Sequence, residues 1–97
     1  MKNRSSDELF IVCWATEHCV FVSDGLSVDG ADTFSGFKEA VVKFSKRNKL
    51  SRLAAENYAR CVTSEPQATM YTVNPNDTTY LKEIYHDMET LREMMDL

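Results

Sequence analysis

Residues 9–15 have the sequence Leu9-Phe10-Ile11-Val12-Cys13-Trp14-Ala15, and this apolar run decides the fold. Its β-branched and aromatic residues favour a strand, and seven residues are too few to cross a membrane. A similar run, Cys19-Val20-Phe21-Val22-Ser23, follows the polar residues 16–18, so the pair predicts a β-hairpin. Because the first strand is apolar at nearly every position, we expect it to lie centrally, with helices covering at least one face.

Two Asp-Gly pairs follow the hairpin. Asp24-Gly25 and Asp29-Gly30 predict turns, since glycine adopts the positive φ that tight turns need. Between them, Leu26-Ser27-Val28 can form a short edge strand.

The apolar period then becomes helical. The 3-4-3 spacing of Phe34, Phe37, Val41 and Phe44 predicts a helix, with Asp32 or Thr33 as its N-cap and Asn48-Lys49 as its stop. Ser51 can cap a second helix. The residues expected on the buried side of that helix are Leu53, Ala54, Tyr58 and either Cys61 or Val62.

A further strand and a long helix complete the chain. Thr69 to Val73 is rich in strand-forming residues, and Asn74-Pro75-Asn76-Asp77 predicts a helix start, with Asn74 as the cap. This last helix should run nearly to Leu97. Its apolar seam consists of Leu81, Ile84, Met88, Leu91 and Met95. The sequence thus predicts one α+β domain over residues 1–97, in the order ββ(β)ααβα, with a small antiparallel sheet of about three strands and about three helices.

Charge is distributed unevenly over the 97 residues. Residues 1–37 hold two basic and six acidic side chains, residues 38–60 hold seven basic and two acidic, and residues 61–97 hold two basic and seven acidic. The net charge is −4. Most of the acids in the last segment fall on the predicted terminal helix, which should therefore display a negative surface.

Helical geometry places these acids on two flanks of the apolar seam. At 100° per residue, Glu83 and Asp87 share one flank, and Glu89, Glu93 and Asp96 share the other. Carboxylates about 6 Å apart along a helix can imitate a row of phosphates. We therefore predict a partner-binding surface with these five residues, supported by the acidic loop residues Asp24, Asp29 and Asp32.

The basic segment offers an alternative. It joins two predicted helices and could approach DNA phosphates as a helix-turn-helix, through Lys43, Lys46, Arg47, Lys49 and Arg52. A direct DNA binder usually has a basic domain, whereas this sequence has a pI near 5.1. The basic segment could instead pair internally or contact an acidic partner.

Neither catalysis nor a cofactor is indicated. The three cysteines are odd in number and lack paired C-x-x-C spacing, so we expect them to be reduced. A zinc site using Cys13, His18 and Cys19, with His86 or Cys61, is the weaker interpretation, because Cys13 lies inside an apolar run. No phosphate loop or nucleophile motif appears. We expect a cytoplasmic, monomeric protein that is not an enzyme, has no cofactor and binds a protein partner rather than nucleic acid or a membrane.

In size, charge and α+β layout the chain resembles the small acidic anti-CRISPR proteins of phages and prophages, especially those that inhibit type I surveillance complexes as DNA mimics. The residues that would take the part of the mimic are Glu83, Asp87, Glu89, Glu93 and Asp96. The resemblance implies a stoichiometric inhibitor in the bacterial host cell that occupies the PAM-reading or DNA-binding site of a Cas protein assembly. The basic stretch from Lys38 to Arg60 departs from a uniformly acidic mimic.

Overall fold

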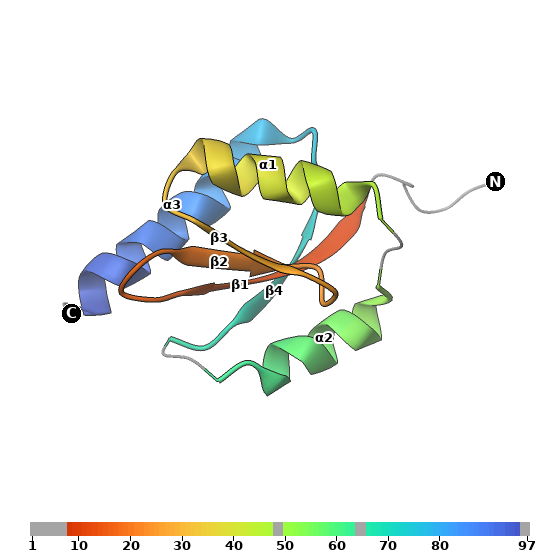
Figure 1. Ribbon diagram of the computed structural model, residues 1–97, viewed down its shortest axis with the longest axis horizontal. Coiled ribbons are helices and arrows are strands. Elements are labelled where there is room, and N and C mark those ends of the chain that lie inside the picture. Colours follow the sequence, from red (N-terminus) through yellow and green to blue (C-terminus); the bar gives the residue numbers. More distant parts are fainter. Residues whose placement is uncertain (1–7, 48–49, 64–65, 96–97) are drawn as a thin grey trace.

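A computed structural model describes residues 8–47, 50–63 and 66–95 (Figure 1). Three strands come first and are followed by two helices, a fourth strand and a last helix. The strands are β1 (Leu9–Ala15), β2 (Val20–Ser23), β3 (Val28–Ala31) and β4 (Thr69–Val73). The helices are α1 (Phe34–Ser45), α2 (Arg52–Cys61) and α3 (Thr78–Met95). The predicted α+β class is confirmed.

The sheet has four antiparallel strands in the order β3-β2-β1-β4. As the sequence predicts, β1 is central, and it pairs with β2 on one side and β4 on the other. Side chains of β1 alternate between two faces. Leu9, Ile11, Cys13 and Ala15 are all buried in the main core, whereas Trp14 lies on the other face.

The first face of the sheet is covered by α1 and α3, which also contact each other (Figure 1). The predicted helical periods explain this packing. From α1, Phe37, Val41 and Phe44 are fully buried, and from α3, Leu81, Ile84 and Met88 join them. The core seam of α3 thus points toward the sheet, and its acidic flanks are left at the surface.

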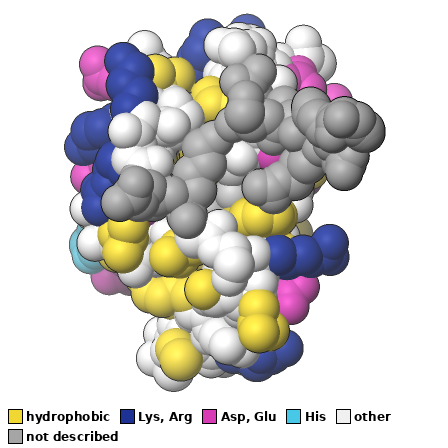
Figure 2. Space-filling model, turned by 90° about the vertical axis from the view of Figure 1, so that its right-hand side faces the viewer, with side chains coloured by type: hydrophobic (Ala, Val, Ile, Leu, Met, Phe, Trp, Pro, Cys, Tyr) yellow, Lys and Arg dark blue, Asp and Glu magenta, His cyan; other side chains and the backbone are white. Residues whose placement is uncertain are grey.

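The second face of the sheet is covered in part by α2, below the sheet in Figure 1. Trp14 stacks on Phe21 at 5.5 Å between ring centroids and contacts Tyr58 of α2 at 6.5 Å. The expected buried side of α2 is wrong at Leu53, which is 65% exposed, whereas Ala54 and Tyr58 are partly buried. Of the two alternatives at the end of the helix, Cys61 is exposed and Val62 is partly buried. Ala55 is buried instead, since a small side chain lets the helix approach the sheet. Figure 2 shows hydrophobic side chains gathered in the lower part of one face of the molecule.

The second Asp-Gly pair does not form the expected turn. Only the first pair does so, with Gly25 at φ 89° and Asp24 Oδ1 accepting hydrogen bonds from the backbone N–H groups of Leu26 and Ser27. Strand β3 therefore begins at Val28 and includes Asp29 and Gly30, rather than occupying residues 26–28. Gly30 fits the strand because a Cβ there would meet Cys19 Sγ at 2.9 Å and the Phe21 ring at 3.1 Å.

Side-chain caps start each helix. Thr33 accepts from the backbone N–H of Gly36, and Ser51 accepts from that of Ala54, as predicted. The start of α3 differs, because its cap is Asp77, whose Oδ1 accepts from the N–H of Tyr80 at 3.1 Å. Asn74 Oδ1 instead accepts from the N–H of Asn76, which shapes the turn before the helix. The predicted stop at Asn48-Lys49 lies outside the described residues. None of the described helices is long and apolar enough to cross a membrane.

Candidate protein-binding surface

Helix α3 presents its acids on the side facing away from the sheet. Glu83, Asp87 and Glu93 are exposed, and Glu89 is partly exposed. Asp96 lies outside the described residues. The four described carboxylates therefore flank the buried seam of Ile84 and Met88 as the helical periodicity predicts.

The β1–β2 turn adds a fifth carboxylate that sequence reasoning missed. Arg92 of α3 reaches this turn, where its Nε donates to the carbonyl of Thr16 at 3.0 Å and its Nη2 donates to that of Glu17 at 3.3 Å. These contacts hold Glu17 beside α3. Glu17, Glu89, Arg92 and Glu93 line a shallow depression of about 230 Å³. We call Glu17, Glu83, Asp87, Glu89 and Glu93 the acidic surface.

The acids of α3 have no ion-pair partners among the described residues. Within the part of the chain that the structure describes, none of the four takes part in an ion pair. Glu17 contacts His18 Nε2 at 3.2 Å, which is an ion pair only when His18 is protonated. Arg92 directs its N–H groups to backbone carbonyls rather than to the neighbouring glutamates. The acidic surface therefore keeps negative charge that no described cation pairs with.

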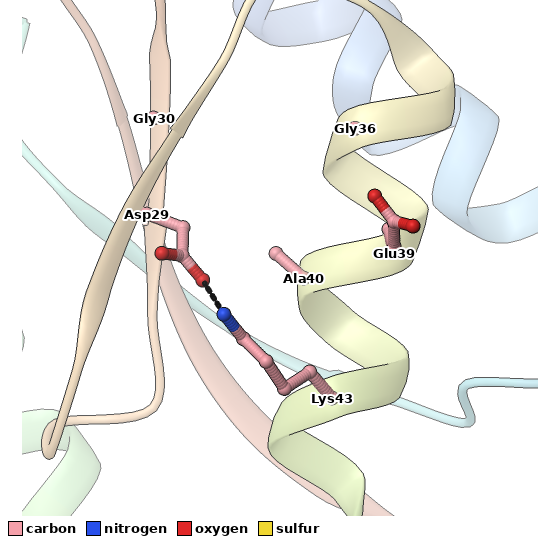
Figure 3. A pocket seen from close by; sticks show the side chains of 6 residues that line it. All are labelled: Asp29, Gly30, Gly36, Glu39, Ala40 and Lys43. Atoms are coloured by element: carbon pink, nitrogen blue, oxygen red, sulfur yellow. Dashed lines mark ion pairs between the residues drawn. The ribbon is translucent and has the colours of Figure 1, made fainter.

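The acidic loop behaves differently. Asp24 is 3% exposed, and its Oδ2 lies 3.6 Å from Nε of Arg47, which also donates to Ser27 Oγ. Figure 3 shows the second pair, in which Asp29 Oδ2 lies 3.1 Å from Lys43 Nζ of α1. Asp32 is exposed. The three predicted loop carboxylates thus differ in their exposure to a partner. Asp24 is buried and stabilises the turn, and Asp29 is paired with Lys43 of α1. Asp32 is exposed and can contact a partner.

The basic segment is largely occupied within the protein. Lys43 and Arg47 pair with the acidic loop, and Arg52 Nε lies 3.1 Å from Glu56 Oε2 within α2. Lys46 is exposed, and Lys49 lies outside the described residues. A helix-turn-helix packs its two helices together, whereas α1 and α2 lie on opposite faces of the sheet (Figure 1). The structure therefore does not bring the basic residues into that motif.

A buried tyrosine, Tyr85, lies near Glu89 of the acidic surface. Tyr85 is 4% exposed and packs against Phe34 and Phe37, and its hydroxyl has no hydrogen-bond partner among the described residues. Burial raises the pKa of Tyr85, and the negative charge of Glu89 raises it further. The hydroxyl therefore stays protonated and adds no charge to the surface.

The candidate metal ligands occupy separate places. Cys13 is buried on the core face of β1, Cys61 is exposed on α2, and His18 is exposed at the β1–β2 turn. No group of three or more His, Cys, Asp or Glu side chains within the described ranges could hold a metal ion. Burial raises the pKa of the Cys13 thiol well above its ordinary value, which makes it a poor nucleophile.

Comparisons with known proteins do not identify a relative: no protein-family model, curated protein or solved structure matches this chain.

Proposed function

We propose that this protein is a non-enzymatic inhibitor that binds a protein assembly at its DNA-binding site, with the acidic surface in place of DNA phosphates. One observation carries the proposal. Lys43, Arg47 and Arg52 are in internal ion pairs, whereas the described α3 carboxylates are not. The negative charge that remains is displayed along one helix, where a partner can reach it.

The geometry of α3 suits such a partner. Successive acids of one flank are about 6 Å apart along an axis rising 1.5 Å per residue, and the helix is held rigidly by its buried seam. A protein site that binds DNA already holds Lys and Arg side chains at the spacing of phosphates. Each exposed ion pair contributes only about 0.2–1 kcal/mol, but a cluster facing a preformed basic site gains from electrostatic complementarity.

The partner to test first follows from the resemblance to anti-CRISPR proteins. We propose a type I CRISPR surveillance complex in the cytoplasm of the bacterial host, bound at its PAM-reading or DNA-binding site, with target duplex excluded. Binding should compete with target DNA and weaken as salt is added, because exposed charges are screened within about 10 Å at 0.1 M ionic strength.

Charge reversal on α3 tests the proposal. The double variant Glu89→Lys with Glu93→Lys should keep its melting temperature within a few degrees and weaken inhibition of target-DNA binding by roughly tenfold or more. Target-DNA binding by the complex is measured by gel shift with increasing inhibitor. The control is Glu39→Lys, which reverses one exposed charge on α1, outside the acidic surface, and should inhibit normally. The single variant Glu93→Lys makes the same change in net charge on α3 and should inhibit more weakly than the parent.

Two results would contradict the proposal. In the first, the α3 variant inhibits as well as the parent protein. In the second, the parent protein itself binds duplex DNA in a gel shift, and Lys46→Glu abolishes that binding. The second result would assign the activity to the basic segment.

A further inference from the structure

Strand β3 is an edge strand, since its partner in the sheet is β2 alone among the described strands. An edge strand leaves a row of backbone N–H and C=O groups that can pair with another chain. Natural edges are commonly protected by short length, charged side chains, proline or a bulge. Strand β3, Val28-Asp29-Gly30-Ala31, is short but contains neither lysine nor proline, and the charge of Asp29 is paired with Lys43. Leu26 and Val28, which are 54% and 47% exposed, add apolar surface beside it.

A pocket of about 410 Å³ lies along this edge, between β3 and α1 (Figure 3). Asp29 and Gly30 form its β3 side, and Gly36, Glu39, Ala40 and Lys43 form its α1 side. The α1 wall is made of small side chains at Gly36 and Ala40, with longer charged groups beyond them. The pocket thus has room for one side chain that enters from the sheet edge.

Gly36 is a residue that the fold does not require. Its φ is not in the positive region, and an added Cβ would make ordinary contacts, at 3.4 Å from Thr33 Oγ1 and 3.7 Å from Ala31 Cβ. Glycine inside a helix is less stable than alanine because it loses more backbone freedom. A methyl group there would point toward Ala31 of β3. The glycine therefore weakens α1 and keeps the gap between α1 and β3 open.

The pocket favours a positively charged side chain. Glu39 and Asp29 contribute two carboxylates, and Lys43 contributes one cation. Lys43 Nζ lies 3.1 Å from the buried Oδ2 of Asp29, so these two charges offset each other. Glu39 is exposed and takes part in no ion pair among the described residues. A guanidinium or ammonium group in the pocket would pair with Glu39 and balance the remaining negative charge.

From these observations we infer that the β3 edge binds an extended segment of a partner protein, which adds a strand to the sheet and places an arginine or lysine in the pocket. Main-chain hydrogen bonds give such binding its affinity, and the pocket gives its specificity. None of the residues involved belongs to α3. This inference is therefore independent of the proposed inhibitory function, and either can fail without the other.

A peptide titration tests the inference. The ¹⁵N-labelled full chain is titrated with the acetylated and amidated peptide Thr-Val-Arg-Val-Thr, and amide shifts are followed by NMR. Shifts should concentrate in β3 and in residues 36–43 of α1. The same peptide with norleucine in place of arginine should bind more weakly, and Glu39→Gln should weaken binding of the arginine peptide by roughly two- to fivefold.

The variant Gly36→Ala separates binding from stability. It should raise the melting temperature, because alanine favours the helix, and yet weaken peptide binding. The inference is overturned if the peptide shifts no β3 amide, if arginine and norleucine peptides bind equally, or if Gly36→Ala binds as well as the parent chain. A concentration-dependent dimer that pairs through β3 would overturn it too, because a second copy would then occupy the edge.

Discussion

Asp24 shows how a single carboxylate is accommodated in the interior of the protein. Its Oδ1 accepts two backbone N–H groups of the turn that follows β2, at 2.9 and 3.0 Å, and its Oδ2 faces Arg47. A buried carboxylate is tolerated when hydrogen bonds and a cation compensate for lost hydration. Asp24 therefore fixes the β2–β3 turn to the end of α1.

Removal of this carboxylate should destabilise the protein. We expect Asp24→Ala to lower the free energy of unfolding by about 2–4 kcal/mol, because two backbone donors and Arg47 lose their partner. Urea denaturation measures the change. The control is Asp32→Ala, which removes an exposed carboxylate and should shift stability by less than about 0.5 kcal/mol. Equal losses in the two variants would mean that the Asp24 network does not stabilise the fold.

Helices α3 and α2 differ in how well the sequence pattern predicts which side of the helix faces the core. The 3-4 periodicity of α3 places Met88 in the core with an exposed fraction of 3%, whereas Leu53 of α2 is exposed despite its apolar side chain. In α2 the core-facing position is Ala55, and a small residue gives a weak periodic signal. The apolar pattern therefore predicted the contact of Tyr58 with the sheet but was wrong about Leu53.

This difference gives a paired test. Met88→Asp buries an unpaired charge and should destabilise the protein by several kcal/mol, on the order of 3–5. The same substitution at Leu53 should have little effect, because that side chain already faces water. Thermal melting followed by circular dichroism compares the two. If Leu53→Asp is the more damaging variant, the orientation of α2 described above is incorrect.

The sequence predicts the elements better than it predicts their contacts. Strand β1, the capping residues Thr33 and Ser51, and the core seam of α3 follow from local patterns of burial and capping. The bounds of β3 do not, because its pairing with β2 continues through Asp29-Gly30, a sequence typical of a turn. The pairing of Asp24 with Arg47 does not either, because it joins residues that are distant in the chain. The position of Glu17 in the acidic surface is a further example, since Arg92 brings it there from 75 residues away.

The whole molecule separates its charges by position. Lys43 of α1 pairs with β3, and Arg47, just after α1, pairs with the β2–β3 turn. The acids of α3 remain on the side of that helix away from its buried seam. Among the described residues, the α3 carboxylates thus carry negative charge that no internal ion pair uses. Between these surfaces lies a core that also contains ionisable groups, and these groups make global stability depend on pH.

Two buried groups, Cys13 and Tyr85, and the partly buried Tyr71 should make the protein less stable in alkaline solution. Burial is the main cause that raises the pKa of Tyr71 from 10.0 to about 12, and burial likewise raises those of Tyr85 and Cys13. The unfolded chain releases these protons at lower pH, so the folded state binds more protons and loses stability as pH rises. The free energy of unfolding should therefore begin to fall as the pH passes about 9, the ordinary range of a thiol, and should keep falling toward about 12.

The variant with Tyr71→Phe and Tyr85→Phe provides the control for this pH dependence. It removes both phenols, and one of them, Tyr85, has no hydrogen-bond partner among the described residues to lose. Urea denaturation at about pH 8 and about pH 11 should show a smaller drop for this variant than for the parent. The remaining drop would come from Cys13, and Cys13→Ala should reduce it further. If the parent protein is equally stable at both pH values, the pKa values of these three groups do not differ between the folded and unfolded chain. That result would contradict the raised pKa values described above.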